Sequence, residues 1–427
     1  MVMTTRNRAS LLPDAVGSVL DQDFGDFELV VSDNWSTDRT AEVLRGFDDP
    51  RVKAVRPPQM LAQPDGWEFA LGHARGEYLA FLGDDDALCA GALGRVAEVA
   101  GPTRAPVVAW DPGFYYYDQW YEPARANTIE LFGCSGTVRE VASRETLRWL
   151  FTGQGMPLPG VNTPPLIITS AYRADVVERL RRRNGGFFLP IHCDISACVA
   201  ILTQTDRYLH LNDALSLRGK GEGNCSYELY RAPRGGSHVT ELGDAGRLRH
   251  VTLDSVTLWN LTCETMLRMK ALMPAELADL DVPPEHYLAK QEEDLWVLRR
   301  GGVDVSGELG ELRRAVARLG PEERARLRRA RGGAARWGPR SAARWAIDRW
   351  PALSRLEQLI RGPAGEWAWV RKKVVIRGGE AGFAGIRECA RWLDDKVRAE
   401  LHQVDLGRGE GVPGRGKIVT GNPWKVL

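Results

Sequence analysis

The stretch GEYLAFLGDDD, residues 76–86, runs from a short apolar segment directly into three adjacent carboxylates. Residues 77–82 have the length and composition of a buried strand, so the aspartates 84–86 stand at its carboxyl end. An earlier run of the same kind, residues 27–32, ends at the polar sequence DNWSTD, residues 33–38. In open α/β sheets, ligands bind beyond the carboxyl ends of the strands. The two acidic clusters therefore predict a ligand site at one edge of a sheet.

The rest of the first hundred residues supports a sheet of this kind. Apolar residues at helical spacing alternate with short apolar runs, and Pro13 falls in the first turn of the first helix. This alternation predicts an α/β fold whose mostly parallel sheet is covered by helices on both faces. The expected helices span 11–20, 37–45 and 66–74, and the expected strands span 27–32, 51–55 and 77–82. Further along the chain, the apolar run 166–168 predicts another strand, and an amphipathic pattern over 250–273 predicts a helix that Pro274 ends.

The composition excludes several broad classes of protein. In 427 residues, 57 Lys and Arg balance 56 Asp and Glu, and this near-neutral charge argues against a strongly basic nucleic-acid binder. No apolar run reaches the roughly 18 residues that a membrane-spanning helix needs. The seven cysteines include no CxxC pair, so neither a disulfide framework nor a structural zinc site is predicted. We expect a reduced, cytoplasmic protein of two or three domains.

The acid triplet, Asp84, Asp85 and Asp86, has two interpretations. Adjacent carboxylates at a strand end repel one another unless a positive charge lies among them. A divalent cation such as Mg²⁺ or Mn²⁺ suits these hard oxygen ligands, and substrate phosphates commonly complete its coordination shell. The alternative is a solvated acidic turn before the next helix, because aspartate also favours helix N-termini.

Four motifs, taken in order, carry a resemblance to a known family. They are TRNR at residues 5–8, SDNWSTD at 32–38, ARGEY at 74–78 and FLGDDD at 81–86. With this order and spacing, residues 1–100 resemble the inverting family 2 glycosyltransferases of the GT-A fold. The resemblance is fainter over 101–230 and absent beyond about 300. It implies a GT-A, Rossmann-like α/β domain with a mixed, mostly parallel sheet, followed by a largely α-helical C-terminal extension.

The resemblance also implies roles for the residues of these motifs. One group would line the nucleotide pocket and contact the base and the ribose, namely Thr5, Asn7, Arg8, Asp33 and Asp84. Asp85, with Asp86 nearby, would coordinate the Mn²⁺ or Mg²⁺ that bridges the diphosphate. A metal ion in that place stabilises the charge that develops on the leaving phosphate. Asp33 has an alternative role, since an aspartate before Ser-Thr-Asp often caps the following helix.

A candidate general base lies in the second half of the domain. An inverting transferase needs a carboxylate that removes the proton of the acceptor hydroxyl. In the family this residue stands at the start of a helix after a Gly-Gly or Gly-Phe turn, and here GGFFLPIHCD, residues 185–194, leads into an apolar helix. Asp194 is the candidate, although Cys193 stands where the family often has glutamate. The alternatives are that Asp194 is an ordinary helix cap and that His192 is the base.

The segment LHLNDALSLRG, residues 209–219, resembles the strand and basic turn that close the family's domain. Family members often place a histidine just beyond this turn, and this sequence has Lys220 instead. We expect Arg218 or Lys220 to neutralise the diphosphate as a cation.

The chain divides into four predicted segments. They are the nucleotide-sugar-binding half of the domain at 1–105, the acceptor-binding half at 106–235, a helical segment at 236–300 and an Arg- and Trp-rich helical extension at 301–427. Between residues 313 and 350, twelve arginines accompany three acids and three tryptophans. One interpretation is peripheral contact with the inner face of an anionic membrane, and the other is a solvated helical face packed on the catalytic domain. An apolar stripe over 383–401 predicts docking on the body or on a second subunit.

The start of the chain is unusual for the family. Only Val2 and Met3 precede the first polar turn, whereas the family's first strand usually has five or six apolar residues. A central strand cut that short would leave sheet hydrogen bonds unmade. We therefore expect either a natural start upstream of Met1 or an unusually short first strand, and the upstream reading frame distinguishes the two.

Together these features predict a metal-dependent inverting glycosyltransferase that moves a sugar from a nucleoside diphosphate donor to an acceptor hydroxyl. Uridine diphosphate is the family's default leaving group, and the acceptor is a glycan, a lipid-linked molecule or a small molecule. No nucleic-acid partner is expected, and self-association into a homo-oligomer stays open.

Rival functions come from two other classes. One is a catalytically inactive module of the same fold that binds a nucleotide or a carbohydrate. The other is a sugar-phosphate nucleotidyltransferase, which usually has an early glycine-rich phosphate loop, and residues 1–30 contain no glycine cluster. A dinucleotide oxidoreductase is disfavoured because no GxGxxG follows the first strand.

Overall fold

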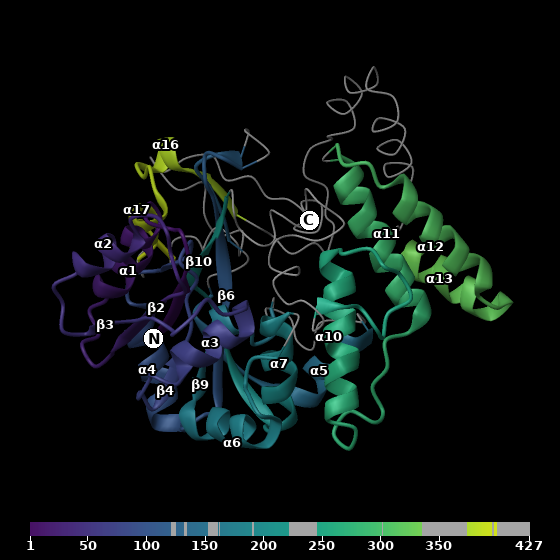
Figure 1. The fold of residues 1–427 in the computed structure, drawn as a ribbon, viewed down its shortest axis with the longest axis horizontal. Helices are drawn as coiled ribbons and strands as arrows, with labels where there is room; N and C mark the ends of the chain where they lie inside the picture. Colours follow the sequence, from purple (N-terminus) through teal and green to yellow (C-terminus); the bar gives the residue numbers. More distant parts are fainter. Residues whose placement is uncertain are drawn as a thin grey trace.

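In the computed structural model (Figure 1), three parallel strands open the fold. They are β1 (Val2–Thr5), β2 (Leu29–Asp33) and β3 (Val52–Val55), hydrogen-bonded in the order β1-β2-β3. The helices between and after them are α1 (Leu12–Leu20), α2 (Thr40–Arg45) and α3 (Gln63–Leu71). This alternation confirms the expected α/β class. Thr5 pairs with Asp33 in the parallel register, so β1 and β2 end side by side.

The structure describes most of the chain. The described residues are 1–120, 125–131, 135–152, 161, 163–189, 192–221, 246–300, 302–334, 374–394 and 397–398. Much of the segment 313–350 therefore lies outside the described residues, including Trp337, Trp345 and Trp350.

A second sheet is built around two long parallel neighbours, β6 (Val107–Tyr116) and β10 (Arg207–Lys220). Their antiparallel partners are β5 (Ala87–Leu88), β7 (Thr128–Leu131), β8 (Thr137–Ala142) and β9 (Ser170–Arg173). The edges are completed by β4 (Tyr78–Ala80), which pairs with β9, and by β11 (Val374–Arg377), which pairs with β7. A parallel bridge between Val2 and Phe81 links the two sheets.

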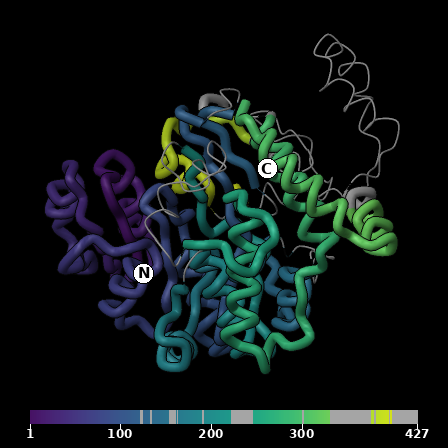
Figure 2. The backbone as a smooth tube through the Cα atoms, turned by 45° about the vertical axis from the view of Figure 1, so that its right-hand side comes forward, coloured from purple at the N-terminus to yellow at the C-terminus, as the bar shows by residue number. Residues whose placement is uncertain are grey.

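The remaining helices surround these sheets and extend away from them. They are α4 (Ala92–Thr103), α5 (Ser143–Thr152), α6 (Ala174–Asn184), α7 (Cys193–Thr203), α10 (Leu258–Leu272), α11 (Pro284–Arg300), α12 (Ser306–Arg318), α13 (Pro321–Ala334), α16 (Gly378–Ala381) and α17 (Ile386–Trp392). Helices α10 to α13 lie on the opposite side of the molecule from α1 and α2 (Figures 1 and 2). None of the helices in the described part of the chain combines the length and the hydropathy that crossing a bilayer needs.

Different helices bury the two faces of the central strands. Because successive side chains of a strand point to opposite faces, Val2 and Met3 belong to two separate apolar cores, and Val107 and Val108 divide in the same way. The first core includes α3, α6 and α7, and the second includes α1 and α4. The prediction of helices on both faces is confirmed.

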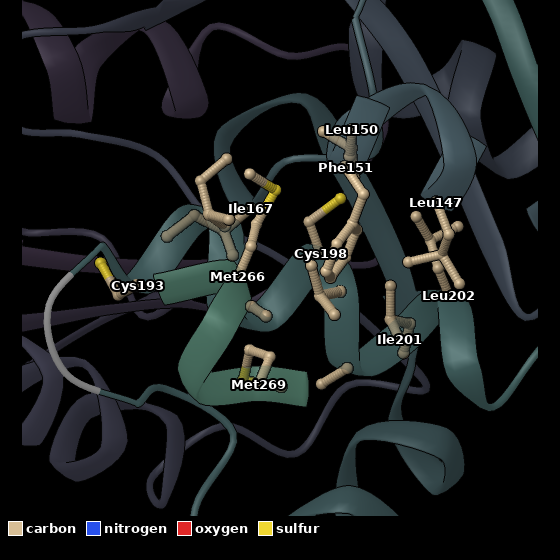
Figure 3. Close-up of a cluster of buried hydrophobic side chains, with 14 of the residues drawn as sticks. Leu147, Leu150, Phe151, Ile167, Cys193, Cys198, Ile201, Leu202, Met266 and Met269 are labelled. Atoms are coloured by element: carbon tan, nitrogen blue, oxygen red, sulfur yellow. The ribbon is translucent and has the colours of Figure 1, made fainter. Parts of the chain in front are cut away.

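Helix α7, which carries Asp194, is held in the first of these cores. Its apolar residues, among them Cys198 and Ile201, pack between Phe151 of α5 and Met266 of α10 (Figure 3). Nearly every residue of α7 is buried, so the helix is hydrophobic all round rather than on one stripe. The first turn of α7 is therefore fixed in position by the elements that surround the helix.

A third core joins the residues after the acid triplet to the end of the chain. Ala87 and Cys89 pack with Ile376, Ile386 and Leu393, all of them buried. The described residues of the apolar stripe predicted over 383–401 thus dock on the body of the same chain. Part of the predicted C-terminal extension, β11 and α17, therefore lies against β5, β7 and β10.

Two predicted elements are wrong. Residues 166–168, predicted as a strand, lead into the 3₁₀ turn η2 (Ile167–Thr169), in which the Thr169 amide donates to the Leu166 carbonyl. The strand is the following segment, β9, because its residues pair with both β4 and β6. The helix predicted from residue 250 begins only at Leu258, where the Thr257 side chain accepts the amide of Asn260 and caps it.

Candidate functional site

The site is built where β1 and β2 end. Thr5 and Asp33 are both buried and are partners in the parallel register. Asp33 Oδ1 accepts the amide of Ser36 at 2.9 Å, and its Oδ2 accepts the Arg56 guanidinium at 3.1 Å. The helix-capping alternative for Asp33 does not hold, because α2 begins at Thr40, whose amide donates to Asp38.

Asn7 and Arg8 connect the turn after β1 to the turn after β2. Asn7 adopts a left-handed backbone conformation, with φ of 56°. Its Oδ1 accepts the amide of Thr37 at 2.8 Å, and the Arg8 amide donates to Thr40 Oγ1 at 3.1 Å. Two of the four sequence motifs are therefore locked together through direct hydrogen bonds.

The acid triplet lies against the same turn. The Thr5 side chain lies near the Asp84 carboxylate, and Arg8 Nε lies 3.9 Å from Asp84 Oδ1. Burial, followed by the charge of Asp85, raises the pKa of Asp84 to about 7. Burial and Asp85 raise the pKa of Asp86 to about 7 in the same way. The triplet is thus a group of crowded carboxylates with little solvent to screen their repulsion.

The end of β10 closes the other side of the triplet. The Gly219 amide donates to Asp86 Oδ1 at 2.9 Å, and the positive charge of Arg218 acts on the same carboxylate. Lys220 is 8% exposed and its Nζ lies 5.1 Å from the centre of the Phe114 ring. Burial, followed by the charge of Arg218, lowers the pKa of Lys220 to about 7, although the charge of Asp86 acts in the opposite direction. Both predicted diphosphate-binding cations therefore lie beside the acid triplet.

The donor set is compatible with a hard divalent cation shared with a ligand. In the part of the chain that the structure describes, no group of three or more His, Cys, Asp or Glu side chains is arranged to hold a metal by itself. Asp86 Oδ1 accepts the Gly219 amide. Magnesium-type ions are commonly bound through one or two carboxylates together with substrate phosphates. A cation beside Asp85 would also relieve the repulsion that raises the pKa of its two neighbours.

Sequence reasoning missed two residues that contact the triplet. The Tyr117 hydroxyl donates to the Asp85 carbonyl oxygen at 3.1 Å. Gly219 packs so closely on the same carbonyl that a Cβ at this position would overlap it. The glycine between two cations at the end of a predicted strand was a usable signal, whereas the run FYYYD, residues 114–118, had no feature that singled out Tyr117.

Asp194 lies on a separate element, in the first turn of α7, and is half-buried. The N-cap residue of α7 is His192, so Asp194 is inside the helix and is not its cap. His192 Nδ1 lies 3.2 Å from Thr262 Oγ1 of α10, and its amide donates to Thr265 Oγ1 at 3.3 Å. Burial raises the pKa of Cys198, and the charge of Asp194 one turn earlier adds to this rise.

Comparison with known proteins supports the motif-based resemblance. Residues 1–157 match the family model described as "Glycosyl transferase family 2". One curated relative is the "GalNAc(5)-diNAcBac-PP-undecaprenol beta-1,3-glucosyltransferase" of Campylobacter jejuni, 37% identical over 110 residues, which are 25% of this chain and 36% of that protein. Another is the "UDP-Glc:alpha-D-GlcNAc-diphosphoundecaprenol beta-1,3-glucosyltransferase WfgD" of Escherichia coli, 30% identical over 86 residues, which are 20% of this chain and 34% of that protein.

The matched part of the chain thus spans about a third of the length of these two relatives. Among solved structures, S. aureus TarS 1–349 in complex with UDP-GlcNAc aligns with a TM-score of 0.41 at 16% identity, over 99% of this chain and 96% of that one.

Proposed function

We propose that this protein transfers a sugar from a nucleoside diphosphate donor to an acceptor hydroxyl with inversion at the anomeric carbon, because residues 1–157 match the family 2 glycosyl transferase model. The observation that supports this most is the network at the strand ends. It joins crowded carboxylates on one side to two cations, Arg218 and Lys220, on the other. A diphosphate bridged by a metal ion carries both kinds of charge that such a site can bind.

In this proposal each part of the network has one role. The nucleotide lies against Thr5, Asn7, Arg8, Asp33 and Asp84. The diphosphate faces Arg218 and Lys220, whose positive charge stabilises the oxygen that becomes negative as the sugar leaves. Asp85, with Asp86 beside it, would hold Mn²⁺ or Mg²⁺, which would supply further stabilisation of that charge when bound.

Asp194 is the proposed general base. As the acceptor oxygen attacks the anomeric carbon, the hydroxyl proton passes to the carboxylate, and the sugar–phosphate bond breaks on the opposite face. The half-buried first turn of α7 keeps this carboxylate in a fixed place while leaving it accessible to an acceptor. His192, the other candidate, has its Nδ1 3.2 Å from Thr262 Oγ1 of α10.

The identity of donor and acceptor is proposed from the relatives. The names of two relatives include a glucosyl group and an undecaprenol-linked acceptor, and one of them includes UDP-Glc. We therefore propose a UDP-sugar donor and an acceptor joined to a lipid through a diphosphate.

A thermal-shift screen of nucleoside diphosphates with and without Mn²⁺ tests donor binding. A ligand that binds only the folded protein stabilises it by about 2.7 kcal/mol at a hundred times its Kd. We expect UDP with Mn²⁺ to raise the Tm by a few degrees and the other nucleotides to raise it less. An equal shift for every nucleotide, or a shift that does not need the metal, would contradict the proposed site. A UDP-specific shift without any sugar transfer would instead identify an inactive binding module.

We also propose membrane contact for the first arginines of the Arg- and Trp-rich stretch 313–350. Arg313 and Arg314 are exposed on α12, on the side of the molecule away from α1 and α2 (Figure 1). We expect the full chain to sediment with vesicles of phosphatidylglycerol but not of phosphatidylcholine, and salt to weaken this binding. The double variant Arg313→Gln and Arg314→Gln should bind less. Equal sedimentation with both lipids would refute the proposal and favour the solvated helical face.

A further inference from the structure

The last described residues of the chain pack against the residues that follow the acid triplet. Residues 374–394 and 397–398, here called the return segment, contribute β11 and α17 and pack against α1, β5 and β10. In the ribbon view α16 and α17 of this segment lie beside α1 and α2 (Figure 1). Its apolar side chains share a core with Ala87 and Cys89, the residues that follow the triplet.

Both backbone polar groups of Ala90, four residues after Asp86, are bonded to the return segment. The Ala90 amide donates to the Ala390 carbonyl at 3.1 Å. The Ala90 carbonyl accepts Nη2 of Arg398, also at 3.1 Å. The segment that follows the acid triplet is therefore hydrogen-bonded to residues about 300 positions later in the sequence.

Arg398 connects this polypeptide to β10. Its side chain is 3% exposed, and its Nε lies 3.2 Å from Oδ1 of Asp213, which is 8% exposed. Its Nη1 donates to the Leu393 carbonyl at 2.7 Å. One planar guanidinium thus hydrogen-bonds the end of α17 and the segment after the triplet, and forms an ion pair with β10. A lysine ammonium on a flexible chain cannot reproduce this geometry.

Asp213 lies on the strand whose other end closes the site. From Asp213, β10 continues through Ser216, which pairs with Leu88, to Gly219, whose amide bonds Asp86. In addition, the Cys89 amide donates to the Leu215 carbonyl at 3.0 Å. The distance between Asp86 and β10 is thus set at two places, by Gly219 directly and by Arg398 through Asp213 and Ala90.

We propose that Arg398 is a positioning residue for the acid triplet. By joining Asp213 to Ala90 it holds the triplet loop against β10, so that Asp85 and Asp86 stand at a fixed distance from Arg218 and Lys220. This inference rests on the proposed function, in which these groups bind the metal and the diphosphate of the donor. Misplacing a reacting group by about 1 Å can reduce the rate about a hundredfold, so a distant tether is able to control turnover.

The same segment supplies a matched control. Arg391 also bonds an aspartate of the catalytic half, Asp21 of α1, with Nε to Oδ2 at 2.8 Å. It is 55% exposed, and Arg387 bonds the same carboxylate at 2.8 Å. Arg391→Met therefore removes an arginine from α17 but leaves the helix anchored and the triplet loop untouched.

The experiment compares full-length Arg398→Met, Arg398→Lys and Arg391→Met with the parent protein. We expect Arg398→Met to raise the half-saturating Mn²⁺ concentration and lower kcat about tenfold or more, with the acceptor KM unchanged. Arg391→Met should match the parent, and Arg398→Lys should recover part of the loss. A merely structural arginine would change the Tm without changing the metal dependence. Should Arg398→Met fail to fold, Asp213→Asn, which keeps the shape of the side chain, replaces it.

Hydrogen exchange in the absence of any substrate provides the second measurement. In Arg398→Met the amides of Cys89 and Ala90 should exchange faster than in Arg391→Met. Unchanged exchange, or an unchanged metal dependence in a protein that transfers sugar, would overturn the proposal. Faster exchange in a protein that transfers no sugar with any metal would reject the proposed function. It would still support the role of Arg398 in holding the triplet loop against β10.

Discussion

Replacing Asp85 by asparagine is expected to lower sugar transfer about a hundred- to a thousandfold, the loss typical when one group that stabilises developing charge is removed. The reason is that the family resemblance assigns the metal on the donor diphosphate to Asp85, which stands between Asp84 and Asp86 and whose charge raises the pKa of both. The measurement is the release of nucleoside diphosphate from a nucleotide-sugar at saturating Mn²⁺.

The folding stability of Asp85→Asn should not decrease, although its activity does. The charge of Asp85 raises the pKa of both neighbouring carboxylates, so its removal relieves repulsion in the folded state. We expect the Tm of Asp85→Asn to equal or exceed that of the parent protein. Asp26→Asn, at an exposed aspartate, serves as the control and should change neither quantity. Full turnover in Asp85→Asn would reject Asp85 as the metal ligand.

The second large effect is expected for Asp194→Asn. Loss of a general base costs about a hundred- to ten-thousandfold in kcat, whereas the KM for the donor should stay close to that of the parent. Asparagine keeps the shape of the side chain but cannot take up the proton of the acceptor hydroxyl. The measurement is steady-state transfer with donor and acceptor varied separately.

Two further variants make this result specific. Glu145→Gln removes an exposed acid from the first turn of the neighbouring helix α5 and should transfer sugar normally. It controls for the loss of a favourable charge near a helix N-terminus. His192→Gln tests the alternative base. If His192→Gln lost more activity than Asp194→Asn, the proton would go to the histidine and our assignment would be wrong.

Much of the secondary structure of the first hundred residues can be predicted from local sequence patterns. Short apolar runs bounded by polar turns indicate buried strands, and the strands expected at 27–32, 51–55 and 77–82 correspond to β2, β3 and β4. Such runs are also ambiguous. Residues 166–168 are as apolar as a strand and yet lead into a 3₁₀ turn, because pairing with β4 and β6 falls to the next four residues.

The candidate site was predictable to the same extent. Parallel strands bring their carboxyl ends to one edge, so motifs far apart in sequence could be expected to meet, and Thr5, Asp33 and Asp84 do so. The capping role that was open for Asp33 depended on where α2 begins. That boundary was settled by Asp38, whose carboxylate accepts the Thr40 amide.

The sequence by itself determined the alternation of strands and helices and the acidic residues at the strand ends, because both depend on neighbours a few residues apart. Only the tertiary structure showed which residues support the segment that follows those acids. Arg398 and Asp213 are charged residues, which normally lie at the surface, and no local pattern marks them as a buried pair. Their contact exists because the apolar side of α17 is buried against β5 and β10, and this packing joins parts of the chain that are far apart in the sequence.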